Sequence, residues 1–123
     1  MLSAFQTAKN SIKKHIEDYP SSFPPVVLNI SDGEPTDCGD PTDWEILMNE
    51  AEQIKSFGGE GQHPLICNIH LDPLGRAPPS TYSHKPPILA NVEAGLWHLS
   101  SIVPDYMIDQ IPNLKDNNRK GGE

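Results

Sequence analysis

The first twenty residues alternate between apolar and charged positions with a period of three to four residues. The apolar members of this series are Leu2, Phe5, Ala8, Ile12, Ile16 and Tyr19. Lys9, Lys13 and Glu17 fall between them, so one face of the segment is apolar and the other is charged. This period is typical of an amphipathic helix that packs on a core. Because Pro20 cannot continue a helix, the pattern predicts a helix over residues 2–19.

Two unbroken apolar runs predict β-strands over residues 26–31 and 65–71. The first run, Val26 to Ile30, contains no charged residue, which is typical of a strand covered on both faces. In the second run, Leu65, Cys67, Ile69 and Leu71 share one face and Ile66 lies on the other. Both segments are therefore expected to be strands of one sheet.

A second helix is predicted between the two strands, over residues 41–57. Asp40 suits the N-cap, Pro41 the first helical position and Asp43 the first turn. Gly58 or Gly59 can end the helix through a left-handed residue. The order strand, helix, strand with short connections requires a parallel pair of strands joined by a right-handed crossover. The sequence thus predicts an α/β fold, with part of a doubly wound, Rossmann-like parallel sheet flanked by helices.

The rest of the chain predicts a loop, two short helices and a tail. Five prolines between Asp72 and Pro87 disfavour helix and central strand, so residues 72–88 are expected to form a Pro-rich loop. Helices are predicted over residues 90–101, where Gly95 weakens the helix, and over residues 105–111. Residues 1–112 would form a single domain, and the polar residues 113–123 a disordered tail.

Composition and charge narrow the classes of partner. The chain has 123 residues, 36% of them apolar, and a net charge of −8 with a pI near 4.9. Nucleic acid and membrane are not expected as partners, because phosphate contacts need clustered Lys and Arg. Cys38 and Cys67 form no disulfide framework, and the chain shows neither a signal peptide nor an apolar stretch of about 18 residues. We expect a soluble, cytoplasmic protein.

The end of the first predicted strand carries the most specific motif in the chain. Ser31, Asp32 and Gly33 follow the apolar run directly, and Glu34, Pro35, Thr36 and Asp37 come next. This run resembles the third cation-binding loop of the von Willebrand factor type A (vWA) domain, of the bacterial intracellular type. The resemblance extends to about Tyr106 and implies a vWA-like fold that lacks its first half.

The same resemblance implies a divalent-cation site of the kind called MIDAS. Asp32 would be its main ligand, with Glu34, Thr36 and Asp37 as weaker candidates and Mg²⁺ or Mn²⁺ as the ion. Two further loops of the family, Asp-x-Ser-x-Ser and Gly-Gly-Thr-Pro-Met, are missing, although Met1 matches the methionine of the second. The site is therefore expected to be incomplete and weak. An Asp-Gly pair that only forms a turn is the structural alternative for Asp32.

As a function, the resemblance implies a protein-binding adaptor without enzymatic activity. The alternative is a split fragment that binds no metal and works by pairing with another chain, either a second copy or the missing amino-terminal half. An unpaired apolar strand edge favours such pairing, so a homodimer is expected. A metal-dependent phosphohydrolase with Asp32 as nucleophile and Asp37 as acid/base is less favoured, because Glu34 stands where such enzymes carry a second aspartate.

Overall fold

The computed structural model describes residues 1–32, 36–38, 44–71, 74–75 and 91–110. Within these ranges it contains the following elements: α1 (Leu2–Asp18), β1 (Val26–Ser31), a short 3-10 helix η1 (Thr36–Cys38), α2 (Glu45–Lys55), β2 (Leu65–His70), α3 (Asn91–Leu99) and α4 (Asp105–Ile108).

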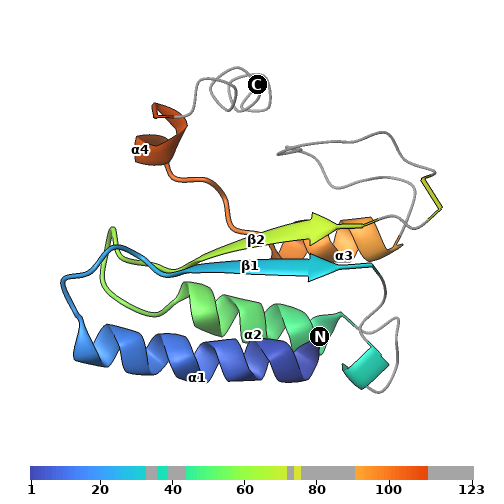
Figure 1. The fold of residues 1–123 in the computed structure, drawn as a ribbon, viewed down its shortest axis with the longest axis horizontal. Coiled ribbons are helices and arrows are strands. Elements are labelled where there is room, and N and C mark those ends of the chain that lie inside the picture. The colour runs from blue at the N-terminus through green and yellow to red at the C-terminus, as the bar shows by residue number, and fades with distance from the viewer. Residues whose placement is uncertain (33–35, 39–43, 72–73, 76–90, 111–123) are drawn as a thin grey trace.

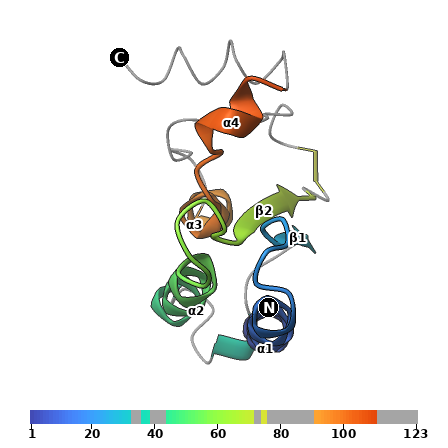
Figure 2. The same ribbon diagram turned by 90° about the vertical axis from the view of Figure 1, so that its left-hand side faces the viewer.

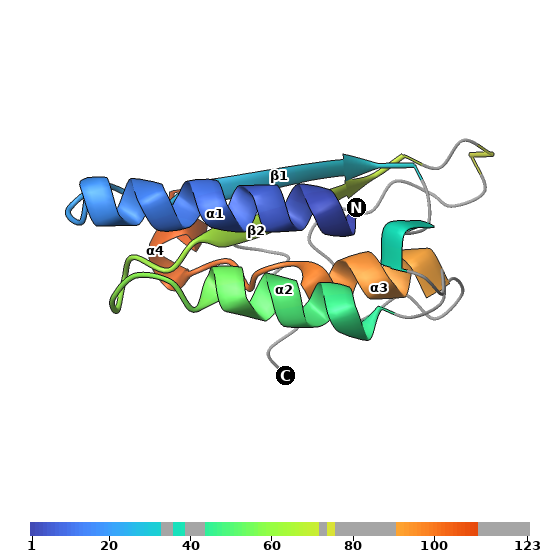
Figure 3. The ribbon, with the colours of Figure 1, turned by 90° about the horizontal axis from the view of Figure 1, so that it is seen from below.

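Strands β1 and β2 form a parallel pair, with Val26 opposite Leu65 and Ser31 opposite His70. This confirms the predicted α/β character and the parallel arrangement. Helices α1 and α2 lie side by side under one face of the pair (Figure 1 and Figure 3). Helix α3 lies beside β2, on the side away from β1 (Figure 2). The described elements thus form a two-stranded sheet with α1 and α2 along one face and α3 along the β2 edge, while α4 lies on the other side of the sheet from α1 and α2 (Figure 1 and Figure 2).

The core lies between the inner face of the sheet and the three longer helices. Its members have side chains that are almost fully buried, and they include Phe5 and Ile12 of α1, Leu47, Ala51 and Ile54 of α2, Ile66 of β2, and Leu96 and Leu99 of α3. The three residues from α2 recur at four- and three-residue spacing, which places them on one helix face. Most of the periodic apolar positions of the sequence therefore point inward, as expected for amphipathic helices, whereas Tyr19 at the end of the first series is 62% exposed.

The prediction that β1 is covered on both faces is wrong. Val27 packs against the core, but Val26, Leu28 and Ile30 on the opposite face are 53%, 65% and 61% exposed. Successive side chains of a strand point to opposite faces, so these three share the face that turns away from the helices. An apolar run shows that a strand can be covered twice, whereas coverage itself depends on elements elsewhere in the chain.

Several helix ends differ from the predicted ones. Helix α1 ends at Asp18, one residue early, where the N–H of Tyr19 still donates to His15 O at 2.8 Å. Helix α2 has Trp44 at its N-cap and Ser56 at its C-cap. The predicted cap Asp40 lies outside the described residues, as do most of the Pro-rich loop and the whole tail.

Two positions near α2 need a glycine, one for its backbone conformation and one for its lack of a side chain. Gly58 follows the helix with φ of +74°, in the left-handed region, which agrees with the predicted way of ending it. Gly95 sits in α3 directly against the Trp44 ring, where a Cβ would come within 2.5 Å of Cε2 and Cε3. Gly95 therefore allows α3 to approach the buried Trp44, which is a packing role that the sequence did not show.

Candidate functional site

Asp32 is the predicted main cation ligand, and it lies immediately after the carboxyl end of β1. Ligands of open α/β sheets bind at this end of the strands. Its side chain is exposed, and it makes no hydrogen bond or ion pair with any part of the chain that the structure describes. Glu34 lies outside the described residues, and for Thr36 the structure describes only the backbone, in η1. Asp32 is thus an available carboxylate at the expected place.

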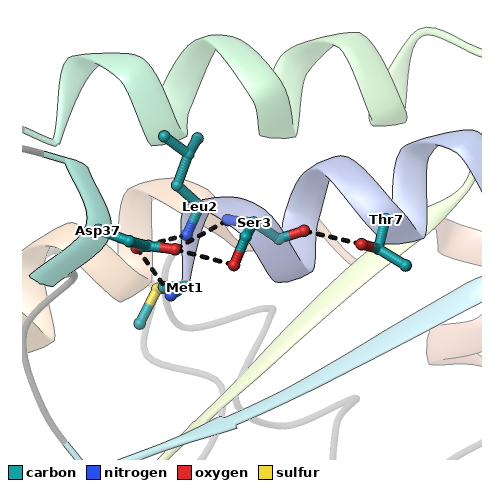
Figure 4. A network of polar contacts seen from close by, with 5 residues as sticks. All are labelled: Met1, Leu2, Ser3, Thr7 and Asp37. Atoms are coloured by element: carbon teal, nitrogen blue, oxygen red, sulfur yellow. Dashed lines mark hydrogen bonds and ion pairs between the residues drawn. The ribbon is translucent and has the colours of Figure 1, made fainter.

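Asp37 lies at the amino end of α1 instead of standing free (Figure 4). Its Oδ1 accepts a hydrogen bond from the Leu2 N–H at 2.8 Å and lies 2.8 Å from the Met1 amino nitrogen. Its Oδ2 accepts bonds from the Ser3 N–H at 2.8 Å and from Ser3 Oγ at 3.1 Å. The Met1 ammonium and these N–H donors hold the pKa of Asp37 well below its usual range.

This contact supplies the N-terminal cap that α1 lacks locally. The first N–H groups of a helix have no partner inside the helix, and the positive end of the helix dipole favours a carboxylate there. Met1 occupies the N-cap position and contributes no side-chain cap. Asp37, 34 residues from Ser3 along the chain, takes this role and ties η1 to α1. No sequence signal pointed to it, because a capping residue is normally sought next to the helix.

The described residues do not by themselves make up a complete site for Mg²⁺. This ion prefers several oxygen ligands in octahedral geometry, and Asp32 offers one carboxylate. Any ion at Asp37 would have to displace the donors at the start of α1. Among the residues that the structure describes, no three His, Cys, Asp or Glu side chains come together as a metal-binding group. The metal role of Asp32, Glu34, Thr36 and Asp37 stays a prediction.

A chain of amide and hydroxyl groups joins the inner face of the sheet to α3. Asn29 Nδ2 donates to Asn68 Oδ1 at 2.8 Å, which links the two strands. Asn68 Nδ2 in turn donates to Leu96 O at 3.1 Å and to Ser100 Oγ at 2.9 Å. The backbone of Ile66 bonds to Ser101, through Ser101 N to Ile66 O and Ile66 N to Ser101 Oγ, both at 2.8 Å. The far edge of β2 is therefore partly occupied by the segment that follows α3.

The far edge of β1, in contrast, faces away from every described element. The sheet order is β1-β2, and among the described residues nothing pairs with the other side of β1 (Figure 2). Leu65 N donates to Pro25 O and Leu71 N donates to Ser31 O, both at 2.9 Å. These two bonds show which alternate residues of β1 direct their backbone groups at β2. Since a parallel ladder uses alternate residues, Val27, Asn29 and Ser31 direct their backbone groups at β2.

The three intervening residues of β1 are unusual because they expose both backbone and side chain. By the same alternation, the N–H and C=O groups of Val26, Leu28 and Ile30 point toward the open edge. Their side chains lie on the uncovered face of the sheet, where Ile69 and Leu71 of the second strand region are also 45% and 53% exposed. We call these five side chains the outer apolar face. In the part of the chain that the structure describes, the unpaired edge and the exposed face together form one continuous surface.

Cys38 and Cys67 are not joined in a disulfide. Cys38 is buried in the hydrophobic core, and Cys67 is half-buried opposite Leu28. Burial raises the pKa of the Cys67 thiol. No helix among the described residues is both long and apolar enough to cross a membrane.

Comparison of the chain with protein-family models, with curated proteins and with solved structures finds no significant match. The resemblance to the vWA domain therefore depends on the motif after β1 and on the order of the surrounding elements. The geometry of the described residues provides two candidate surfaces: the carboxylate of Asp32, and the open edge of β1 with its outer apolar face.

Proposed function

We propose that this chain is a protein-binding module that pairs with another polypeptide through the open edge of β1 and the outer apolar face. The observation that carries the proposal is that Val26, Leu28 and Ile30 expose apolar side chains and outward backbone groups at once. An added strand can use both, since main-chain hydrogen bonds provide affinity and alternate side chains provide specificity.

Burial of the exposed apolar side chains of β1 could contribute substantially to the free energy of binding. Complete burial of a Val, Leu or Ile side chain is worth about 1.5–3 kcal/mol. Val26, Leu28 and Ile30 are 53%, 65% and 61% exposed, so covering what remains would contribute roughly 3–5 kcal/mol before the costs of association. Proteins usually protect such an edge with Lys, Pro or a bulge. Strand β1 has neither Lys nor Pro within it.

The proposal can be tested by selecting extended peptides from a random library for binding to the full chain. We expect bound peptides to slow hydrogen exchange of the Val26, Leu28 and Ile30 amides, which face the open edge. Leu28→Lys should abolish binding, because it places a charge in the middle of the surface. Ile102→Lys is the control, since Ile102 is 92% exposed and lies outside both strands. Peptides that bind Leu28→Lys as tightly and leave those amides unprotected would refute the proposal.

A second candidate is cation-assisted protein binding of the vWA type, supported by the exposed Asp32 at the end of β1, which has no partner among the described residues. Asp32, with Glu34 and Thr36 nearby in sequence, would hold Mg²⁺ or Mn²⁺. When bound, the ion would offer a coordination position to a carboxylate of the partner.

The cation hypothesis predicts weak binding that depends on Asp32. Titration with Mn²⁺ should broaden the amide signals around Asp32 only at about millimolar concentrations, as expected for one or two carboxylates. Asp32→Asn should remove the effect, whereas Asp109→Asn, a change at an exposed acid far along the chain, should not. Broadening that persists in Asp32→Asn would exclude this site.

A further inference from the structure

The outward groups of β1 are arranged symmetrically about Leu28. Val26 and Ile30 lie two residues before and two residues after it, and all three direct their N–H and C=O groups to the open edge. In an antiparallel pairing of two identical strands about a twofold axis at Leu28, Val26 would lie opposite Ile30 of the second copy. Leu28 would lie opposite its own equivalent.

This register satisfies every outward backbone group of β1. In an antiparallel ladder, residues of a hydrogen-bonded pair exchange two N–H···O bonds. Two Val26–Ile30 pairs and the central Leu28 pair therefore use all the N–H and C=O groups of these residues in both copies. On the same face, apolar side chains lie opposite apolar side chains, and the outer apolar face becomes continuous across four strands.

Neighbouring registers fit less well. Shifting the pairing by two residues toward the amino end places Ile30 opposite Pro24, which has no N–H to donate. Shifting it by two toward the carboxyl end places Val26 opposite the charged Asp32. A shift of one residue sets outward groups against residues whose backbone is already bonded to β2. Only the register centred on Leu28 avoids all three defects.

Charge is also compatible with self-association at this edge. The chain carries a net charge of −8, but no charged residue occurs from Tyr19 to Ser31. Helix α3 lies on the far side of β2, and no described strand pairs with the β1 edge (Figure 2). The six residues of β1 are about 20 Å long, and their pairing buries less than the roughly 1,200–2,000 Å² of a stable interface. The expected complex is therefore weak and reversible.

On these grounds we infer that a second copy of this chain occupies the edge, with β1 antiparallel to β1 and Leu28 opposite Leu28. This inference rests on the proposed function and names its partner. Dimers would form in a concentration-dependent manner and would contain a four-stranded sheet.

The register can be tested with paired charges at positions 26 and 30. In the double variant Val26→Lys with Ile30→Glu, each lysine faces a glutamate of the second copy. In Val26→Lys with Ile30→Lys, each lysine faces a lysine. Both positions are exposed, so both variants should fold alike, which far-UV circular dichroism would check. Sedimentation equilibrium should give a dimer dissociation constant for the Lys–Glu variant about tenfold or more below that of the Lys–Lys variant.

Hydrogen exchange of the wild-type chain provides the second readout. In the monomer, the amides of Val27, Asn29 and Ser31 should be protected and those of Val26, Leu28 and Ile30 should exchange freely. Raising the protein concentration should slow exchange of the second set. Equal dissociation constants for the two variants, or a wild-type monomer at every concentration, would overturn the dimer. If the dimer is overturned but library peptides still slow exchange of the Val26, Leu28 and Ile30 amides, the proposed function remains supported and only the identity of the partner is wrong. If no peptide protects these amides either, the proposed function is refuted as well.

Discussion

Replacing Gly95 with alanine should destabilise the protein, although glycine normally weakens a helix. At a helical position with free space around it, replacing Gly with Ala stabilises the helix by about 1 kcal/mol. Here the new Cβ would lie within 2.5 Å of Cε2 and Cε3 of Trp44, whose side chain is buried. Overpacking of this kind costs about 1–3 kcal/mol, so we expect a net loss of about 1 kcal/mol.

The assay is urea unfolding followed by far-UV circular dichroism, which remains usable when Trp44 is changed. Gly95→Ala should lower the midpoint, and the added change Trp44→Leu should reduce the penalty of the alanine by making room for it. Gly59→Ala is the matched control, because nothing lies within 4 Å of the place its Cβ would take and its φ is not positive. Stabilisation by Gly95→Ala in the wild-type background would refute the reasoning, since it would mean that Trp44 does not restrict α3.

Three further predictions concern ionisable groups. Asp37→Ala should cost about 1 kcal/mol as a lost helix cap, measured by urea unfolding. Because the folded-state pKa of Asp37 is lowered, its stabilising effect should be full above about pH 4 and fade as the pH falls further. Asp37→Asn should therefore reduce the dependence of the melting temperature on pH below about pH 4. An unchanged dependence would contradict the capping role. Lys9 Nζ lies 2.5 Å from Glu50 Oε2, and the two side chains are 22% and 14% exposed. Lys9→Met alone should therefore lower the free energy of unfolding more than Lys9→Met combined with Glu50→Leu, because the single change leaves a largely buried carboxylate without its partner. If the losses of stability in this double-mutant cycle are additive, the pair is not coupled. Cys67 should react slowly with iodoacetamide at pH 7 because burial raises its pKa, and alkylation as fast as in the urea-unfolded chain would contradict this.

Local patterns were sufficient for the helices and strands, because each depends on residues close together in the chain. The three- and four-residue spacing from Leu2 to Tyr19 predicted α1 to within one residue. The apolar runs predicted β1 and β2, and the order of elements predicted their parallel pairing. The position of Asp32 at the end of β1 follows from the same reasoning. These results depend on backbone periodicity, which is the strongest signal in a single sequence.

Other features depended on which distant segments meet. Asp37 belongs to a motif that resembles a cation-binding loop, and nothing in that motif indicated that Asp37 would cap α1. Gly95 looked like a weak point in a helix until the structure placed it against Trp44. The same limit applied to Asn29 and Asn68, whose amides link the strands to α3.

The sequence alone determined the type and order of the elements, the acidic charge and the apolar character of β1. Only the tertiary structure decided that one face of β1 is covered by helices and that, among the described residues, the side chains on its other face stay exposed. It also decided which backbone groups of the strand point to the open edge. The physical reason is that apolar character is a property of each residue, whereas burial and free hydrogen-bonding groups depend on what the rest of the chain places beside it.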